Sequence, residues 1–130
     1  MLHAEDDLDY IDEHFYVDHP QFPNGQKDQR NWRVWDVSLT GGQMERLLRL
    51  GFLRDRRKPY VVSEFNQPFP SRQGAEILPV MAAVASLQDW DGLFFFDYAN
   101  AATWSHAPAN FTLRGDWGKY VLAGQSARLF

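Results

Sequence analysis

The sequence contains no cysteine, which excludes disulfide bonds, thiolate metal sites and a cysteine nucleophile. It also lacks the glycine-rich phosphate-binding fingerprint, the Gly-x-Ser-x-Gly nucleophile elbow and the His-Glu-x-x-His metal helix. Its four histidines do not show the spacing of metal ligands. We therefore expect neither a metal ion nor another cofactor.

Two further absences concern partners and location. Basic residues are not in excess, since 13 Lys and Arg stand against 17 Asp and Glu. This argues against nucleic acid as a partner, because Lys and Arg lead such contacts. No apolar run reaches the length of about 18 residues that a membrane-spanning helix needs, and the first residues lack the basic and apolar stretches of a signal peptide. We expect no membrane association, and either a cytoplasmic protein or a fragment of a longer one.

The chain has 130 residues, enough for a single domain with one core, which we assign to residues 1–130. It is too short for a complete (β/α)8 barrel, which needs about 250 residues. Aromatic side chains, in contrast, are plentiful: there are five Trp, five Tyr and ten Phe. Such a content suits a core and also a surface that stacks on flat ligands.

Strands and helices are expected to alternate along the chain. Runs of apolar, aromatic and β-branched residues predict strands, and apolar residues at helical spacing predict helices. The expected order is strand 10–17, helix 38–52, strand 59–65, helix 77–87, strand 93–98 and helix 117–129, with Asp116 as the last N-cap. Such alternation predicts an α/β fold whose parallel sheet is joined by right-handed crossovers.

All three predicted strands end in polar side chains that can do chemistry. Ligands bind at the carboxyl ends of parallel strands, so we expect these side chains on one rim. Carboxylates beside aromatic rings fit carbohydrate chemistry, because acids transfer protons or attack the anomeric carbon and rings stack on the sugar. The candidates are Glu64 as the catalytic residue and His14, Tyr16, Asp18, His19, Asn66, Asp97 and Trp104 as substrate-binding residues.

Each kind of candidate also has a structural interpretation. Glu64 ends an apolar run, where an unpaired charge is costly, so it is either a site ligand or half of a structural ion pair. His14 and Tyr16 are either substrate contacts or a half-buried pair. Asp18 and the histidine after it adjoin a proline-rich loop, where turn capping also explains them. Trp104 either forms a sugar platform or packs in the core.

Three segments together resemble strands six, seven and eight of the clan A glycoside hydrolases. They are His14-Phe15-Tyr16, Ser63-Glu64-Phe65-Asn66 and Gly92-Leu93-Phe94-Phe95-Phe96-Asp97-Tyr98. That clan includes cellulases and similar retaining enzymes on (β/α)8 barrels, and the resemblance spans residues 9–130. It implies a partial (half-type) TIM barrel that acts on β-linked sugars or polysaccharides. It further implies that Glu64 is the nucleophile and that Trp104 floors the sugar subsite.

A retaining enzyme of this clan also needs an acid/base Glu, usually in an Asn-Glu pair, and no such pair occurs in this sequence. Asp18 and Asp97 are the second carboxyls that this chain offers. A separation of about 5 to 5.5 Å from Glu64 would suit retention, and about 6.5 to 9.5 Å would suit inversion. Three strands also leave two open sheet edges, which invite pairing with another chain. We therefore expect a homo-oligomer, most simply a dimer, that completes a barrel-like core and brings a partner's carboxylate towards Glu64.

Three functions stay open at this point. The first is an active glycoside hydrolase that works as an oligomer. The second is a non-catalytic carbohydrate-binding module that keeps only a stacking platform around Trp104 and Tyr16. The third is a small α/β domain of another class whose resemblance to the hydrolases is a coincidence.

Overall fold

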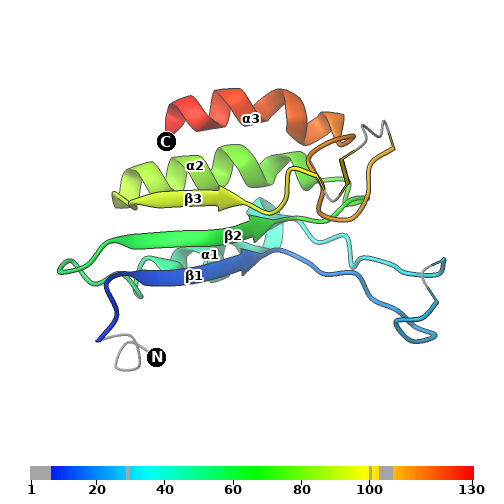
Figure 1. Ribbon diagram of the computed structural model, residues 1–130, viewed down its shortest axis with the longest axis horizontal. Coiled ribbons are helices and arrows are strands. Elements are labelled where there is room, and N and C mark those ends of the chain that lie inside the picture. The colour runs from blue at the N-terminus through cyan, green and yellow to red at the C-terminus, as the bar shows by residue number, and fades with distance from the viewer. Residues whose placement is uncertain (1–6, 29, 100, 103–106) are drawn as a thin grey trace.

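The computed structural model describes residues 7–28, 30–99, 101–102 and 107–130. Strands and helices alternate along the chain, as the sequence predicts (Figure 1). Each of the first two α-helices is preceded by a short turn of a different helical type. The elements are β1 (Ile11–Tyr16), the π-helical turn η2 (Leu39–Gln43), α1 (Met44–Leu50), β2 (Tyr60–Asn66), the 3-10 turn η3 (Gly74–Glu76), α2 (Ile77–Gln88), β3 (Gly92–Phe95) and α3 (Trp117–Leu129).

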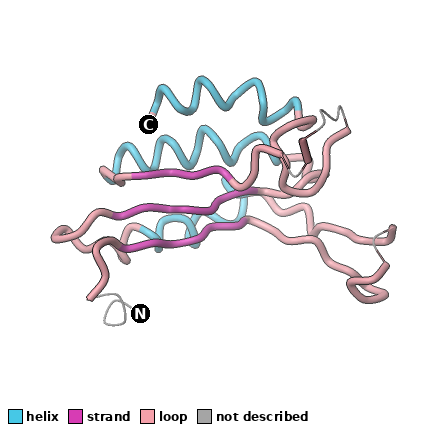
Figure 2. Tube along the Cα trace, in the orientation of Figure 1, coloured by secondary structure: helices cyan, strands magenta, loops and turns pink. Residues whose placement is uncertain are grey.

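The three strands form one parallel sheet in the order β1-β2-β3. Helical segments connect consecutive strands, because a parallel pair cannot be joined by a tight hairpin turn. The predicted small α/β fold with a parallel sheet is therefore confirmed. Loops that follow the three strands gather at the carboxyl end of the sheet (Figure 2). We call this end of the sheet the rim.

The helices pack against one face of the sheet. Successive side chains of a strand point to opposite faces, and in β1 Ile11 and Phe15 are buried whereas His14 is exposed. The buried side chains join one apolar cluster with Leu47 of α1 and Met81 of α2. In Figure 1 the strands lie in front of α1 and α2, so the view is onto the opposite face.

No helix in the described part of the chain covers that opposite face, which we call the bare face. Its side chains alternate in sequence with those of the apolar core, apart from one irregularity in β2 that is described below. The bare face carries Asp12, His14, Tyr16, Val61, Ser63, Glu64 and Phe94.

The third strand is shorter than predicted. The sequence predicts residues 93–98, but β3 ends at Phe95. The amide of Phe96 still donates to β2, at 3.2 Å, whereas the amide of Asp97 donates to the carbonyl of Phe111, at 3.1 Å. The prediction was wrong because a distant loop competes for these backbone groups, and nothing in the local pattern signals that loop.

Glu76 ties the start of the first helical crossover to α2. Its carboxylate accepts hydrogen bonds from the amides of Leu39 and Thr40, and from the hydroxyls of Thr40 at 2.7 Å and Ser38 at 3.2 Å. Burial acts to raise the pKa of Glu76, but these hydrogen bonds, that of the Thr40 hydroxyl first, lower it below its ordinary value. The ionised carboxylate therefore stabilises the fold.

Candidate functional site

A β-bulge in β2 places two consecutive polar residues on the bare face. The pairing of β1 with β2 runs from Glu13↔Val62 to His14↔Glu64, so Ser63 is an extra residue in β2. Val62 is fully buried on the covered face, whereas Ser63 and Glu64 both contact His14. Without the bulge, the two-residue period would turn Glu64 towards the same face as Val62. The bulge therefore keeps a carboxylate out of the apolar core.

Glu64 lies near the rim with its side chain 34% exposed. Its Oε2 accepts a hydrogen bond of 2.6 Å from the hydroxyl of Tyr16 and lies 3.5 Å from Nδ1 of His14. Within the described residues, both contacts of this carboxylate fall on Oε2, which leaves Oε1 to a ligand. The structure thus brings together three of the residues singled out in the sequence.

The Tyr16 hydroxyl remains a hydrogen-bond donor at every pH near neutrality. Burial raises the pKa of Tyr16 well above its ordinary value, and the hydrogen bond to Glu64 and the negative charges of Glu64 and Asp97 raise it further. Because deprotonation is so unfavourable, the hydroxyl keeps its proton throughout the neutral pH range. Tyr16 therefore holds Oε2 of Glu64 in place at any pH near neutrality.

Four rings gather beside Glu64, and we call Tyr16, His19, Phe96 and Phe111 the aromatic cluster. The Tyr16 ring lies 4.8 Å from His19 and 5.2 Å from Phe111, measured between centroids. Phe96 lies 6.3 Å from Tyr16 in an edge-to-face arrangement. Such a cluster offers ring surface to an apolar face of a ligand. Phe111, which comes from the loop before α3, is a member that the sequence analysis did not identify.

Two residues outside the sequence candidates extend the hydrogen bonding away from the rim. The hydroxyl of Ser63 donates to Oδ2 of Asp12 at 2.7 Å and lies 3.1 Å from Nε2 of His14. Together, Asp12, Ser63, His14, Glu64 and Tyr16 form what we call the polar row. The two-residue period from His14 and Tyr16 points back to Asp12, a signal the sequence analysis missed. Ser63 had no such signal, because regular alternation puts it on the face opposite to Glu64.

Asp18 makes structural contacts. It is only 6% exposed. Its Oδ1 accepts a hydrogen bond from the amide of His19 at 2.7 Å, and its Oδ2 accepts one from the amide of Asp36 at 3.0 Å. These are the contacts that the turn-capping interpretation expects. We therefore leave Asp18 out of the surface offered to a ligand, whereas its neighbour His19 belongs to the aromatic cluster.

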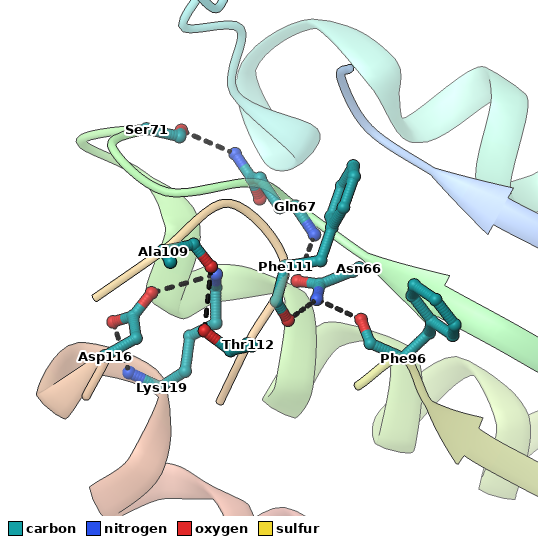
Figure 3. A network of polar contacts seen from close by, with 9 residues as sticks. All are labelled: Asn66, Gln67, Ser71, Phe96, Ala109, Phe111, Thr112, Asp116 and Lys119. Carbon is teal, nitrogen blue, oxygen red and sulfur yellow. Dashed lines mark hydrogen bonds and ion pairs between the residues drawn. The ribbon is translucent and has the colours of Figure 1, made fainter. Parts of the chain in front are cut away.

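Asn66 lies directly beneath the rim and is fully buried. Its Nδ2 donates to the carbonyls of Phe96 and Phe111, and its Oδ1 accepts a hydrogen bond of 2.6 Å from the amide of Gln67 (Figure 3). Asn66 thus joins the end of β2 to two segments that supply rings to the aromatic cluster. In the structure it positions those segments and has no surface for a sugar.

A buried lysine lies in the first turn of α3, beside the same loops (Figure 3). The ammonium of Lys119 lies 2.9 Å from the carboxylate of Asp116, and the lysine side chain is 1% exposed. Burial lowers the pKa of Lys119, and the hydrogen bond and charge of Asp116 oppose that effect. Asp116 also accepts a hydrogen bond from the amide of Lys119, which confirms the predicted N-cap.

The two remaining candidates differ in what the structure describes. Asp97 is half-buried at the rim, and its Oδ1 is buried without a hydrogen-bond partner among the described residues. Trp104 lies outside the described residues, so its role as a sugar platform stays a prediction.

Within the described part, no group of three or more His, Asp or Glu side chains is arranged to hold a metal ion. None of the described helices has the length and apolarity needed to cross a bilayer.

Comparisons of the chain with protein families, with curated proteins and with solved structures find no match in any of the three. The chemistry of the site has to be inferred from its own residues.

Proposed function

We propose that this chain is a glycoside hydrolase that acts on β-linked sugars or polysaccharides, with Glu64 as the nucleophile of a retaining reaction. The observation that carries the proposal is the partly exposed Glu64 carboxylate near the rim, held by Tyr16 on one oxygen. Carboxyl ends of parallel strands are where ligands bind in such sheets. The bulge at Ser63, which aims Glu64 away from the core, is a feature found next to active sites.

In the proposed first step, Oε1 of Glu64 attacks the anomeric carbon of the sugar. The bond from that carbon to the glycosidic oxygen breaks, and the leaving oxygen takes a proton from a general acid. In the second step, a water molecule attacks the same carbon and gives its proton to the same group, now acting as base. Glu64 is released as a carboxylate. Tyr16 holds Oε2, and the aromatic cluster packs on the C–H face of the sugar.

The general acid is not among the side chains that contact Glu64 in the described residues, which are Tyr16 and His14. We propose that the sheet is part of a (β/α)8-type barrel completed by a second copy of the chain, which covers the bare face and supplies the missing carboxyl. Support comes from exposed aromatic residues on and beside that face, with Phe94 58% and Tyr10 51% exposed. Light scattering at micromolar concentration should give a dimer, and a strictly monomeric protein would contradict this part of the proposal.

The alternative is a non-catalytic carbohydrate-binding module. What favours it is that neither described contact of Glu64 is a carboxyl group, whereas retaining hydrolysis needs two carboxyls about 5 to 5.5 Å apart. Titration of Trp fluorescence with soluble sugars separates the two. Saturable binding without hydrolysis of any glycoside would favour the module.

The proposed function is tested with a panel of chromogenic aryl β-glycosides and the variant Glu64→Gln. We expect Glu64→Gln to lower kcat about 10⁴-fold or more, because loss of a catalytic nucleophile can reduce it about 10⁶-fold. Glu45→Gln is the matched control, since Glu45 lies exposed on α1 and pairs only with Arg49 among the described residues. Full activity in Glu64→Gln would overturn the assignment.

A further inference from the structure

A cavity at the rim adjoins the aromatic cluster. It has a volume of about 220 Å³ and is lined by Phe96, Asp97 and residues 109–112. Phe96 and Phe111 line it with their rings in contact with Tyr16, at 6.3 Å and 5.2 Å between centroids. The charge of Asp97 also acts on the hydroxyl of Tyr16. Since Tyr16 donates to Glu64, the Tyr16 side chain links the rings of this cavity to the candidate catalytic carboxylate.

Two acceptor oxygens at this cavity are buried without partners. Oδ1 of Asp97 and Oδ1 of Asn110 each have no hydrogen bond within the described residues, and both residues line the cavity. A buried acceptor left without a donor destabilises a fold, and native structures satisfy nearly all such groups. Two orphan acceptors on residues that line one cavity therefore indicate a ligand that donates hydrogen bonds there.

The surroundings of the two oxygens select the class of donor. A calcium ion takes about six to eight oxygen ligands. No group of three or more His, Asp or Glu side chains among the described residues is arranged to hold a metal ion, at this cavity or elsewhere. A sugar ring, in contrast, carries hydroxyl donors on its edge and C–H groups on its faces. Both kinds of surface find a complement here, the hydroxyls on Asp97 and Asn110 and the C–H groups on the rings of Phe96 and Phe111.

We infer that Asp97 and Asn110 form an acceptor pair that binds two hydroxyl groups of one sugar ring, in a subsite next to Glu64. The identity of the ligand as a carbohydrate rests on the proposed function. The inference goes beyond it by assigning a second recognition element, built from β3 and the loop before α3, that sets which sugar is accepted. Asn110 has a φ of 32°, in the left-handed region that asparagine and glycine tolerate best, so a glycine can replace it without backbone strain.

The test measures sugar binding to the full chain carrying Glu64→Gln, so that no ligand is hydrolysed. The probes are the methyl β-glycosides of glucose, galactose, mannose and xylose, followed by calorimetric titration. For the sugar that binds best, adding Asp97→Asn should weaken binding about 5- to 10-fold, because a hydrogen bond to a charged acceptor is replaced by a weaker one to a neutral amide oxygen. Asn110→Gly should weaken it about 5- to 10-fold, because its acceptor is neutral. Asp89→Asn, in the exposed turn before β3, should change nothing.

Monodeoxy sugars distinguish a direct contact from a loss of structure. The sugar that lacks the hydroxyl bound by Asp97 should bind the Asp97→Asn variant and its parent equally well, because the contact is already gone. Circular dichroism and urea unfolding check that both variants fold. If the chain hydrolyses glycosides but both variants bind sugar as the parent does, the oxygens bind only water and the inference is wrong while the proposed function stands. If no sugar binds either the Glu64→Gln parent or the wild-type chain, the inference and the proposed function are both wrong. If Ca²⁺ stabilises the chain, Asp97→Asn abolishes that stabilisation and no sugar binds, then the cavity binds a cation and the inference is wrong.

Discussion

The covered face of the sheet is built from apolar side chains that meet α1 and α2, whereas the bare face carries the polar row. Neighbouring residues of one strand serve the two faces: Phe95 packs its ring 5.5 Å from Phe65, and Phe94 is 58% exposed. The comparison shows that residues that stabilise the fold and residues that can react alternate along the same strands, on opposite faces of the sheet. In β2 the bulge at Ser63 shifts that alternation by one residue, so Glu64 lies on the bare face.

The largest effect should come from truncating the covered face. Phe65→Ala is expected to lower the free energy of unfolding by about 3 kcal/mol, because Phe65 is only 4% exposed and truncating a buried phenylalanine leaves a cavity behind. Phe94→Ala should change the free energy of unfolding by about 0.5 kcal/mol or less, because Phe94 is exposed and surface substitutions have small effects. Urea unfolding at several protein concentrations measures both and separates any contribution of dimerisation. Equal losses in the two variants would show that the faces are not distinct.

A smaller effect is expected on the bare face, and there it should appear in catalysis. Tyr16→Phe removes the 2.6 Å hydrogen bond to Glu64 and should reduce kcat/KM about 10- to 100-fold, because a misplaced reacting group can cost about 10²-fold. The free energy of unfolding should fall by only about 1 kcal/mol. The measurement is the hydrolysis of an aryl β-glycoside alongside urea unfolding. A Tyr16→Phe variant that loses several kcal/mol of stability would make the polar row part of the structural core.

The smallest effect is expected at Glu76, the residue just before α2, and it depends on pH. The pKa of Glu76 is lowered in the folded chain, so its contribution to stability is present above its ordinary pKa of 4.5 and is lost as the pH falls through the lower folded value. Glu76→Gln should lower the free energy of unfolding by about 1 kcal/mol at pH 7. That difference from wild type should shrink as the pH falls below 4.5. Urea unfolding at pH 7 and at pH 3.5, with Glu45→Gln as control, checks the prediction, and a difference that grows in acid would contradict it.

The sequence predicted the alternation of strands and helices because apolar spacing is a local property of each segment. Helix 117–129 and its N-cap Asp116 follow from such local signals and agree with α3. The bulge at Ser63 has no local signature, because a change of register depends on how β1 pairs with β2. The sequence also does not show that backbone carbonyls from two other segments enclose the amide of Asn66, which was predicted to bind substrate.

The candidate site was predictable where a residue follows the two-residue period of a strand, as His14 and Tyr16 do. It was not predictable where a loop folds back over the rim, as with Phe111 and Asn110. Contacts between segments that lie far apart in the chain decide which polar side chains keep a free surface. Asp18 and Asn66 are polar residues at strand ends, yet both are satisfied by backbone groups.

The central claim is that Glu64 forms a covalent bond to the sugar. It is tested most directly by incubating the chain with a 2-deoxy-2-fluoro-β-glycoside that carries a dinitrophenyl leaving group. This leaving group departs without a proton, so the first step needs no general acid, while the fluorine slows release of the sugar. We predict that tandem mass spectrometry finds one fluorosugar, attached to Glu64. A label on any other residue, or no label on a chain that hydrolyses aryl β-glycosides, would contradict the claim.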